Sequence, residues 1–341
     1  MKKLNSMMCL ALFGTISMAS CTLSPKEDSA DSDSSDVSTP LKIVSPAGAP
    51  SMALYTMIND DSFTTNKDAT QVMAAAKTAT NVDALIFDGV NALKFVKGDL
   101  TQTKWKLARW LTGGNFYIVS TKHTKEETFD PDSKILSFGS NLLPDKVFKK
   151  LASERWNWTI NEENSKYESG TAAVSAVLGS DNYASYDYYF IAEPSLRAAK
   201  ATLKASHSDV TVNEIYNLRT EWKEFSGMDY IPQAGLFINS ETYANRKSDC
   251  DSLLATVDTN LTDAVDNPSE IVKNLNALEP DADKQASKLG FKAALVGDLQ
   301  KDGANRFGMI KPGTISDNRA FVNEFMQKIG ESVTFAEDQF I

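Results

Sequence analysis

The residues predict an α/β fold in which mostly parallel strands are flanked by helices. Three stretches share one pattern, in which a short apolar strand runs through a polar or Gly/Pro turn into a helix. These stretches are 41–58, 81–98 and 186–203. Because parallel strands need crossover connections, the repeated pattern predicts one parallel sheet, or two, with helix N-termini gathered along one face.

The first stretch carries the turn Gly-Ala-Pro-Ser. Pro50 stands at a first-turn position of the helix, where its missing N–H costs nothing, and Ser51 lies beside it. Such a turn lies at the carboxyl end of its strand, where free N–H groups and the positive end of the helix dipole face an entering molecule. We therefore expect Gly48, Ala49, Pro50 and Ser51 to border a ligand crevice, and an ordinary strand-to-helix turn is the alternative.

The chain between and after the first two stretches adds further strands. A short strand is expected within 60–66, and a helix over 68–77 has its apolar residues on one face. The second stretch passes through Asp-Gly at 88–89. After it, 106–121 predicts two strands about Thr-Gly-Gly-Asn at 112–115. The two glycines either let the backbone approach a ligand closely or form a hairpin-like turn.

The pattern restarts after a polar loop. A strand over 134–138 is followed by a Gly-Ser-Asn turn and by a helix whose apolar residues share one side. A short strand is expected over 156–160, and an Ala- and Val-rich buried helix over 170–178. With the third strand-turn-helix stretch behind them, these elements predict a second α/β lobe built like the first.

The strand of the third stretch ends at Glu193-Pro194. A carboxylate beside a helix N-terminus is held ionised and accepts hydrogen bonds from a ligand, but it can equally cap its own helix. Beyond it, 213–239 is expected to carry a helix around Trp222 and then a strand over 231–238. The residues from 240 onward are mostly helical by periodicity, and the last helix covers about 316–329.

The first 21 residues are not expected to belong to the fold. Lys2 and Lys3 precede an apolar stretch, 7–19, which is too short to span a bilayer and ends in small residues before Cys21. This arrangement resembles a bacterial lipoprotein signal, which implies cleavage before Cys21 and lipid, such as palmitate, on that cysteine. A plain secretory signal is the alternative. The Ser- and Asp-rich residues 22–40 predict a disordered tether.

Composition limits the functions that the chain can have. Its 341 residues are enough for two domains, and a net charge of −10 without a Lys/Arg cluster argues against a nucleic-acid partner. His123 and His207 lie far apart and lack metal-ligand spacing, so no metal site is expected. No nucleophile elbow, P-loop or dinucleotide motif occurs, and the sequence predicts no catalytic site and no cofactor. In the processed chain Cys250 has no cysteine partner, so no internal disulfide is expected.

Five segments occur in the order that one known family shows. They are GAPSMALY, VDALIFDGVNALKFVKG, LTGGNFYIVS, YFIAEPSLRAA, and EWKEFSG followed by IPQAGLFIN. With these segments behind a lipoprotein-type signal, the chain resembles the solute-binding proteins of bacterial ABC transporters of the nitrate, sulfonate/taurine and thiamine-precursor type. The resemblance implies the two-lobe periplasmic binding protein fold of type II, a Venus flytrap. It places lobe 1 at 41–119 plus 236–341 and lobe 2 at 120–235, with two crossings as a hinge.

The resemblance also implies a function. The protein is expected to be a monomeric, non-enzymatic lipoprotein on the extracytoplasmic face of the cell membrane, which captures a small molecule between its lobes and delivers it to an ABC permease. Asp88 departs from the family, which usually has a small or hydroxyl residue there. With Glu193 it favours a neutral or partly cationic ligand, of which heteroaromatic compounds are one candidate kind. The ligand-binding positions carried over are Gly48, Ala49, Pro50, Ser51, Asp88, Gly89, Gly114, Asn115, Ser140, Asn141, Glu193 and Gln233.

Two alternative functions stay open at this point. The same fold serves extracytoplasmic sensors or adhesins, and it serves enzymes such as pyrimidine-precursor synthases and dehydratase-type enzymes of menaquinone assembly. The synthases carry a cysteine-rich iron-site motif, which this sequence lacks. Neighbouring permease and ATPase genes would separate transport from sensing, and turnover of a captured compound would reveal an enzyme.

Overall fold

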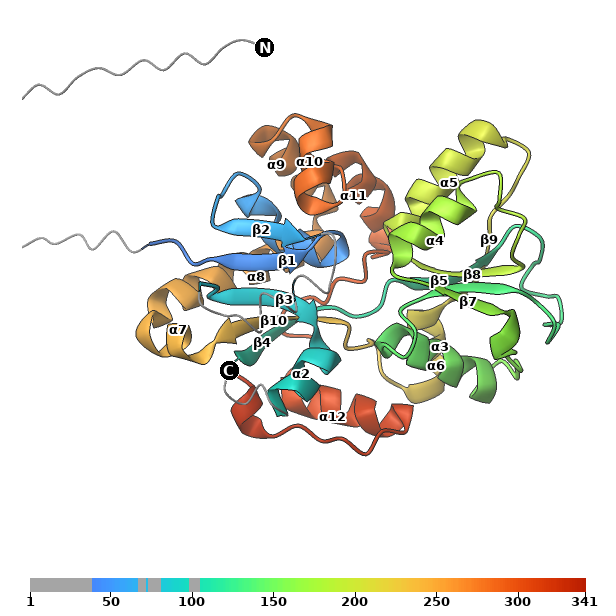
Figure 1. Cartoon of the computed structure of the whole chain (residues 1–341). Coiled ribbons are helices and arrows are strands. Elements are labelled where there is room, and N and C mark those ends of the chain that lie inside the picture. The colour runs from blue at the N-terminus through green and yellow to red at the C-terminus, as the bar shows by residue number, and fades with distance from the viewer. Residues whose placement is uncertain (1–38, 67–71, 73–80, 98–104) are drawn as a thin grey trace, which may run out of the picture. The chain divides into compact units, whose positions relative to one another are not determined.

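A computed structural model describes residues 39–66, 72, 81–97 and 105–341. The chain divides into two units, Met1–Thr39 and Pro40–Ile341, and the architecture below is that of the second unit (Figure 1). The expected signal at 1–21 with its Cys21, and almost all of the expected tether at 22–40, lie outside the described residues. So does the expected helix at 68–77, apart from the buried, helical Val72.

The first sheet has five strands in the order β2-β1-β3-β10-β4. Strand β1 runs parallel to β2 and β3, whereas β10 runs antiparallel to its two neighbours, β3 and β4. The strands are β1 (Ile43–Pro46), β2 (Phe63–Asn66), β3 (Ala84–Asp88), β4 (Trp105–Thr112) and β10 (Ala234–Asn239).

The second sheet repeats this arrangement in the order β7-β6-β8-β5-β9. Strand β6 is parallel to β7 and β8, and β5 is antiparallel to β8 and β9. The strands are β5 (Phe116–Ser120), β6 (Ile135–Phe138), β7 (Ser165–Glu168), β8 (Tyr188–Ala192) and β9 (Asn213–Asn217). The predicted fold class, mostly parallel sheets flanked by helices, is therefore confirmed.

The antiparallel strand of each sheet is the first strand that the chain forms after it crosses over from the other sheet. The chain leaves the first sheet at Thr112 and enters the second at Phe116, and it returns to the first sheet at Ala234. The hairpin alternative for 112–115 is therefore wrong, because β4 and β5 belong to different sheets. Strand β5 pairs within the second sheet. The expected limits of the two lobes, at 119/120 and 235/236, stay a prediction.

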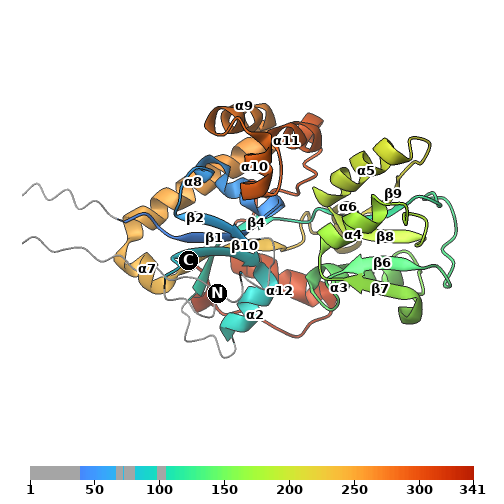
Figure 2. The ribbon, with the colours of Figure 1, turned by 45° about the horizontal axis from the view of Figure 1, so that its top comes forward.

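Helices cover both faces of both sheets (Figure 2). We call each sheet with its helices a body. The first body holds η1 (Ala49–Met57, a 3-10 helix), α2 (Gly89–Lys97), α7 (Ser240–Asn245), α8 (Lys247–Asp266), α9 (Pro268–Leu278), α10 (Ala282–Leu289), α11 (Ala293–Gln300), η4 (Lys301–Gly303), α12 (Asn318–Ile329) and η5 (Glu337–Gln339). The second body holds α3 (Leu143–Glu154), η3 (Glu162–Asn164), α4 (Thr171–Leu178), α5 (Ser195–Ser206) and α6 (Leu218–Ser226).

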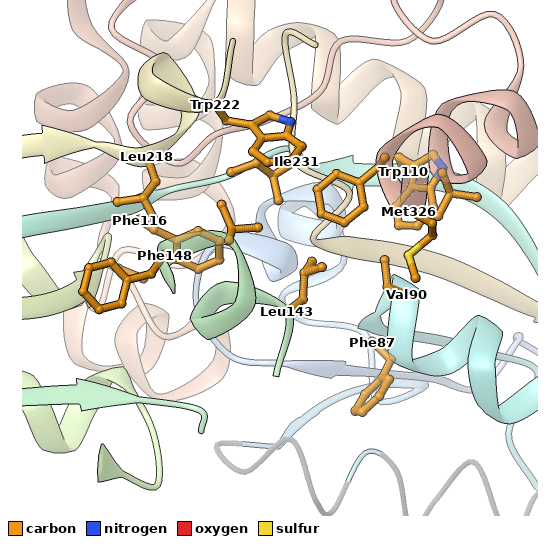
Figure 3. Close-up of a cluster of buried hydrophobic side chains, with 14 of the residues drawn as sticks. Phe87, Val90, Trp110, Phe116, Leu143, Phe148, Leu218, Trp222, Ile231 and Met326 are labelled. Atoms are coloured by element: carbon orange, nitrogen blue, oxygen red, sulfur yellow. The ribbon is translucent and has the colours of Figure 1, made fainter. Parts of the chain in front are cut away.

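The alternation of strand side chains decides which helices each face packs. In β3, Ala84 and Ile86 face the cluster of η1, α8, α9 and α11, whereas Leu85 and Phe87 join the cluster of α2 and α12. That second cluster continues without interruption into the second body, through β5, α3, β8 and α6. Figure 3 shows this continuity in the side chains that run from Phe87 to Trp222. The two bodies thus share apolar core.

One expected strand is wrong for a local reason, and the helix expected to be buried at 170–178 is present but only partly buried. Residues 156–160 form no strand, because Trp156 stacks on Tyr216 with ring centroids 4.1 Å apart and Trp158 stacks on Phe129 at 4.2 Å. Helix α4 is buried only at Val174 and Leu178, so it lies against its sheet along a narrow stripe. Along the described part of the chain, no helix combines the length and apolarity needed to cross a membrane.

Candidate functional site

The two crossings between the sheets run side by side and are hydrogen-bonded to each other. The N–H of Ile231 donates to the Gly113 carbonyl at 2.9 Å, and the N–H of Gln233 donates to the Thr112 carbonyl at 3.2 Å. The Gly114 N–H donates to the Gln233 side-chain oxygen at 3.1 Å. The crossings therefore form one bonded pair of chain segments between the bodies.

Asn115 ties this pair to the end of strand β8. Its side-chain oxygen accepts from the Gln233 amide at 2.9 Å, and its amide donates to the Glu193 carbonyl. The Glu193 N–H donates back to the Asn115 carbonyl at 2.9 Å. Four predicted site residues, Gly114, Asn115, Glu193 and Gln233, thus lie in one hydrogen-bonded network, with Asn115 only 3% exposed.

The Glu193 carboxylate is buried and fully paired. One oxygen accepts from the N–H of Arg197 at 3.0 Å, in the first turn of α5. Glu193 therefore caps its own helix, which was one of the two roles expected for it. The other oxygen accepts from Arg306 Nε at 3.1 Å and Nη2 at 2.8 Å. Because Arg306 neutralises its charge, Glu193 does not present a free anion to a ligand.

The turn at Gly48 lies opposite the β8–α5 junction. A Cβ placed on Gly48 would lie 4.0 Å from Pro194 Cδ, in the other body, and Gly48 has a φ of +109°. The hydroxyl of Ser51 is buried and donates within the first body, toward the Leu289 carbonyl at 2.6 Å and the Gly48 carbonyl at 2.8 Å. Ala49 is also buried. The backbone at Gly48, rather than the Ser51 hydroxyl, therefore faces the second body.

Asp88 and Gly89 join β3 to α2. The Asp88 carboxylate accepts from the Asn91 N–H at 3.0 Å and from its side-chain amide at 3.2 Å, so it caps the helix. Burial raises the pKa of Asp88 to about 6, against the opposing effects of the Asn91 hydrogen bond and of Lys94. Gly89 lies directly under the indole of Trp110, where a Cβ would come within 2.0 Å of the ring. Gly89 is therefore required for packing.

Ser140 and Asn141 are exposed at the β6–α3 junction. Asn141, at a φ of +61°, donates its N–H to Asp145 at 2.9 Å. Its side chain borders a cavity of about 10 Å³, room for about one water molecule, between the two bodies. The first body contributes Asn91 and Lys94 to the same cavity, so the predicted junctions at 88–89 and 140–141 do lie close together.

Five residues near these junctions were not predicted. Glu331 pairs with Lys94 at 3.3 Å and with Lys146 of the second body, and Arg306 pairs with Glu193. Asn91 could have been found, because it stands three residues after a candidate capping carboxylate. The other four carry no motif, since the two residues of each of these ion pairs are 113, 185 or 237 positions apart in the sequence.

No metal-binding cluster accompanies this network in the described ranges. They contain no group of three or more His, Cys, Asp or Glu side chains placed to hold a metal ion. His123 lies 2.8 Å from Glu127 and His207 lies 2.8 Å from Asp181, each on its own part of the surface. Cys250 is buried, and burial raises the pKa of its thiol.

Comparisons with known proteins identify the fold. No protein-family model and no curated protein matches the chain. One similar solved structure is the ligand-binding component of an ABC-type import system from Staphylococcus aureus, with zinc bound. It is 10% identical, the match covers 86% of this chain and 91% of that chain, and the TM-score is 0.59. The periplasmic aliphatic sulphonate-binding protein SsuA from Escherichia coli is 9% identical and covers 85% of each chain, with a TM-score of 0.55.

A third similar structure carries the fold name in its description. It is a Candida albicans gene product described as defining a new family with the generic periplasmic binding protein fold. It is 10% identical and covers 85% of this chain and 89% of its own, with a TM-score of 0.53. At these identities the likeness establishes the fold alone. The chain therefore has the periplasmic binding protein fold that the resemblance of its sequence implies.

Proposed function

We propose that this chain is the solute-binding component of an ABC importer, which captures a small molecule between its two bodies and delivers it to a membrane permease. In this proposal it acts as a monomer without catalytic activity, on the extracytoplasmic face of the cell membrane. Lipid on Cys21, which lies outside the described residues, anchors it there. The import-system and sulphonate-binding structures of the same fold support this assignment.

One observation carries the proposal. The two sheets have the same strand order, and each takes its antiparallel strand through the paired crossings at 113–115 and 227–233. This connection directs the carboxyl ends of β3 and β6, and the helices that follow them, toward one part of the boundary between the bodies. Six of the nine residues that line the small cavity come from these junctions and helices, and the other three come from α12 and the residues after it. In α/β proteins, ligands bind at the carboxyl ends of strands.

The charged side chains that line the small cavity, Lys94, Lys146 and Glu331, pair with one another. The inferred class of ligand therefore depends on the acidic residues at the strand ends. Glu193 was expected to favour a cationic ligand, but its charge is balanced by Arg306. Asp88 keeps part of that preference, because its carboxylate lies at the start of α2 and is half protonated near pH 6. We infer that the ligand is a small neutral or partly cationic molecule, with Asn91 and Asn141 supplying amide hydrogen bonds from opposite bodies.

Native mass spectrometry of full-length protein purified without refolding tests the proposal. We expect a small molecule to copurify, and the same compound, added back at 100 times its Kd, to stabilise the protein by about 2.7 kcal/mol. The permease role is tested by crosslinking in cells that express the neighbouring transporter genes. Conversion of the captured compound to a product would replace this proposal with the enzyme alternative.

Two asparagine variants locate the binding site. Asn141→Ala removes an amide at the carboxyl end of β6, whereas Asn182→Ala removes an exposed amide that precedes the amino end of the parallel strand β8. We expect Asn141→Ala to weaken binding of the copurified compound about tenfold and Asn182→Ala to leave it unchanged, because opposite ends of parallel strands lie far apart. Equal effects of the two variants would place the ligand elsewhere.

A further inference from the structure

Arg306 belongs to a loop that is anchored in the first body. Its N–H donates to the Leu299 carbonyl at 3.0 Å, and the next residue, Phe307, donates its N–H to the Gln300 side chain at 3.1 Å. Phe307 is fully buried in the first-body cluster with η1, α8 and α11. The Gly308 carbonyl accepts from the Gly113 N–H at 2.7 Å. This hydrogen bond fixes the loop against the crossing at 113–115, which leads from the first sheet to the second. The backbone at Arg306 therefore moves with the first body.

The side chain of Arg306 reaches the second body. Beyond its two hydrogen bonds to Glu193 at the end of β8, it binds both carboxylate oxygens of Glu214 in β9, at 3.0 and 2.8 Å. Its guanidinium lies over the ring of Tyr117 in β5, 4.4 Å from the ring centroid. One arginine thus contacts three strands of the second sheet.

The environment of these charges makes the contact a strong one. The Glu193 side chain is 1% exposed and that of Arg306 is 20% exposed. Burial opposes the charged form of Glu214, but hydrogen bonds from Arg306 and Lys200 outweigh it and lower its pKa. The same carboxylates, with Tyr117, raise the pKa of Arg306 despite its burial. Forked arginine–carboxylate pairs are strong and directional, and withdrawal of the cation from a buried pair is costly because it leaves an uncompensated buried charge.

Two other described ion pairs join the bodies, and both are weaker. Arg197 lies 3.9 Å from Asp298, and these side chains are 41% and 65% exposed. Lys146 pairs with Glu331, and these side chains are 38% and 27% exposed. Exposed pairs contribute little because water and salt screen them. Of these three ionic contacts, the one made by Arg306 dominates.

We propose that Arg306 is the closing residue of this protein: its insertion between Glu193 and Glu214 over Tyr117 adds to the shared apolar core in holding the two bodies together, and it sets the balance between closed and open forms. Separation of the bodies withdraws the guanidinium and leaves the buried Glu193 without its cation. If this closing also retains a captured solute, that part of the role of Arg306 rests on the proposed function. The closing role itself concerns only the two bodies.

Small-angle X-ray scattering of full-length protein, unfolded and refolded to remove any copurified molecule, tests the closing role. Arg109→Ala is a matched control, because Arg109 makes a forked pair with Asp258 at 3.0 and 3.1 Å wholly inside the first body. Residues outside the described ranges are identical in all variants. We expect a larger radius of gyration for Arg306→Ala than for wild type, and no change for Arg109→Ala.

Arg306→Lys covers the case in which Arg306→Ala does not fold, as judged by far-UV circular dichroism. Lysine keeps the charge but loses the fork and the stacking, so we expect an intermediate radius of gyration. An unchanged radius in the folded Arg306 variants, or an equal increase in Arg109→Ala, would overturn the proposal. Because no ligand is added, either result leaves the solute-binding proposal standing, and a failure to find a solute leaves the closing role standing.

Discussion

Phe325 of α12 packs against Trp222 of α6, with ring centroids 5.1 Å apart and ring planes inclined at 50°. Both side chains are fully buried, although α12 belongs to the first body and α6 to the second. The indole N–H of Trp222 has no hydrogen-bond partner among the described residues. This contact is apolar packing alone, and it is part of the core that the two bodies share.

Replacement of Phe325 by alanine is expected to destabilise the protein by about 3–5 kcal/mol, because it opens a cavity against Trp222 in a core that cannot collapse freely. Urea unfolding at pH 7 measures the loss. Phe321→Ala is the control on the same helix, since Phe321 is only partly buried and packs edge-on against Trp110 within the first body. A loss for Phe321→Ala as large as that for Phe325→Ala would show that the contact with Trp222 has no special weight.

Asp88→Asn is expected to stabilise the protein at pH 7. The pKa of Asp88 is raised to about 6 in the folded state, above its ordinary value of 3.8. Between these values the folded state binds more protons than the unfolded state, so the free energy of unfolding falls as pH rises through this window. The ionised carboxylate therefore costs up to about 3 kcal/mol above pH 6, and asparagine removes this cost while remaining a good helix cap.

The measurement is urea unfolding of wild type and Asp88→Asn from pH 4 to pH 7.5. The difference in unfolding free energy is expected to be near zero at pH 4 and to grow in favour of the variant up to about pH 7. Other titrating groups cancel in this difference. A constant difference at all pH values would mean that Asp88 titrates normally in the folded protein.

Gly308→Ala is expected to destabilise the protein more than Gly303→Ala. Both glycines have positive φ angles, +69° and +74°, so either substitution costs about 1–2 kcal/mol in backbone strain. A Cβ on Gly308 would also lie 2.3 Å from the Gly114 carbonyl oxygen in the crossing, whereas nothing lies within 4 Å of a Cβ on Gly303. Overpacking adds about 1–3 kcal/mol at Gly308 alone.

Thermal unfolding of the two glycine variants separates these effects. Equal losses would indicate that the loop at Gly308 yields without strain and that it does not fix the crossing. If Gly308→Ala also changes the radius of gyration of the ligand-free protein, a displacement of the loop at Gly308 reaches Arg306, two residues earlier in the same loop.

The sequence predicted the strand-turn-helix units because each combines a buried apolar strand with a local turn signal. The unit at 41–58 has four residues of β1 followed by Gly48 and Pro50, and the unit at 186–203 has the apolar β8 followed by Pro194. The edge strands β7 and β9 were missed, because SKYE and NEIYN carry almost no apolar signal. The expected strand at 156–160 failed since its alternating tryptophans serve aromatic stacking instead.

Of the candidate site, the sequence predicted only the residues that lie in turns at strand ends. Gly48, Asp88, Asn141 and Glu193 could be placed at strand ends, since parallel strands bring their carboxyl ends to one edge. What their side chains contact could not be predicted. The pairing of Glu193 with Arg306 joins residues 113 positions apart, and it depends on a loop whose position follows from the packing of a whole body.

Cys21→Ser is expected to abolish attachment of lipid, because a thioether to lipid needs the cysteine sulfur and serine has none. Metabolic labelling with a tagged palmitate in bacterial cells that express the full chain measures attachment, and fractionation shows the consequence, since stable anchoring needs more than one acyl chain. Cys250→Ala is the matched control, because this cysteine is buried in α8 and should not affect labelling. Label retained by Cys21→Ser, or protein secreted equally by wild type and variant, would favour the plain secretory signal.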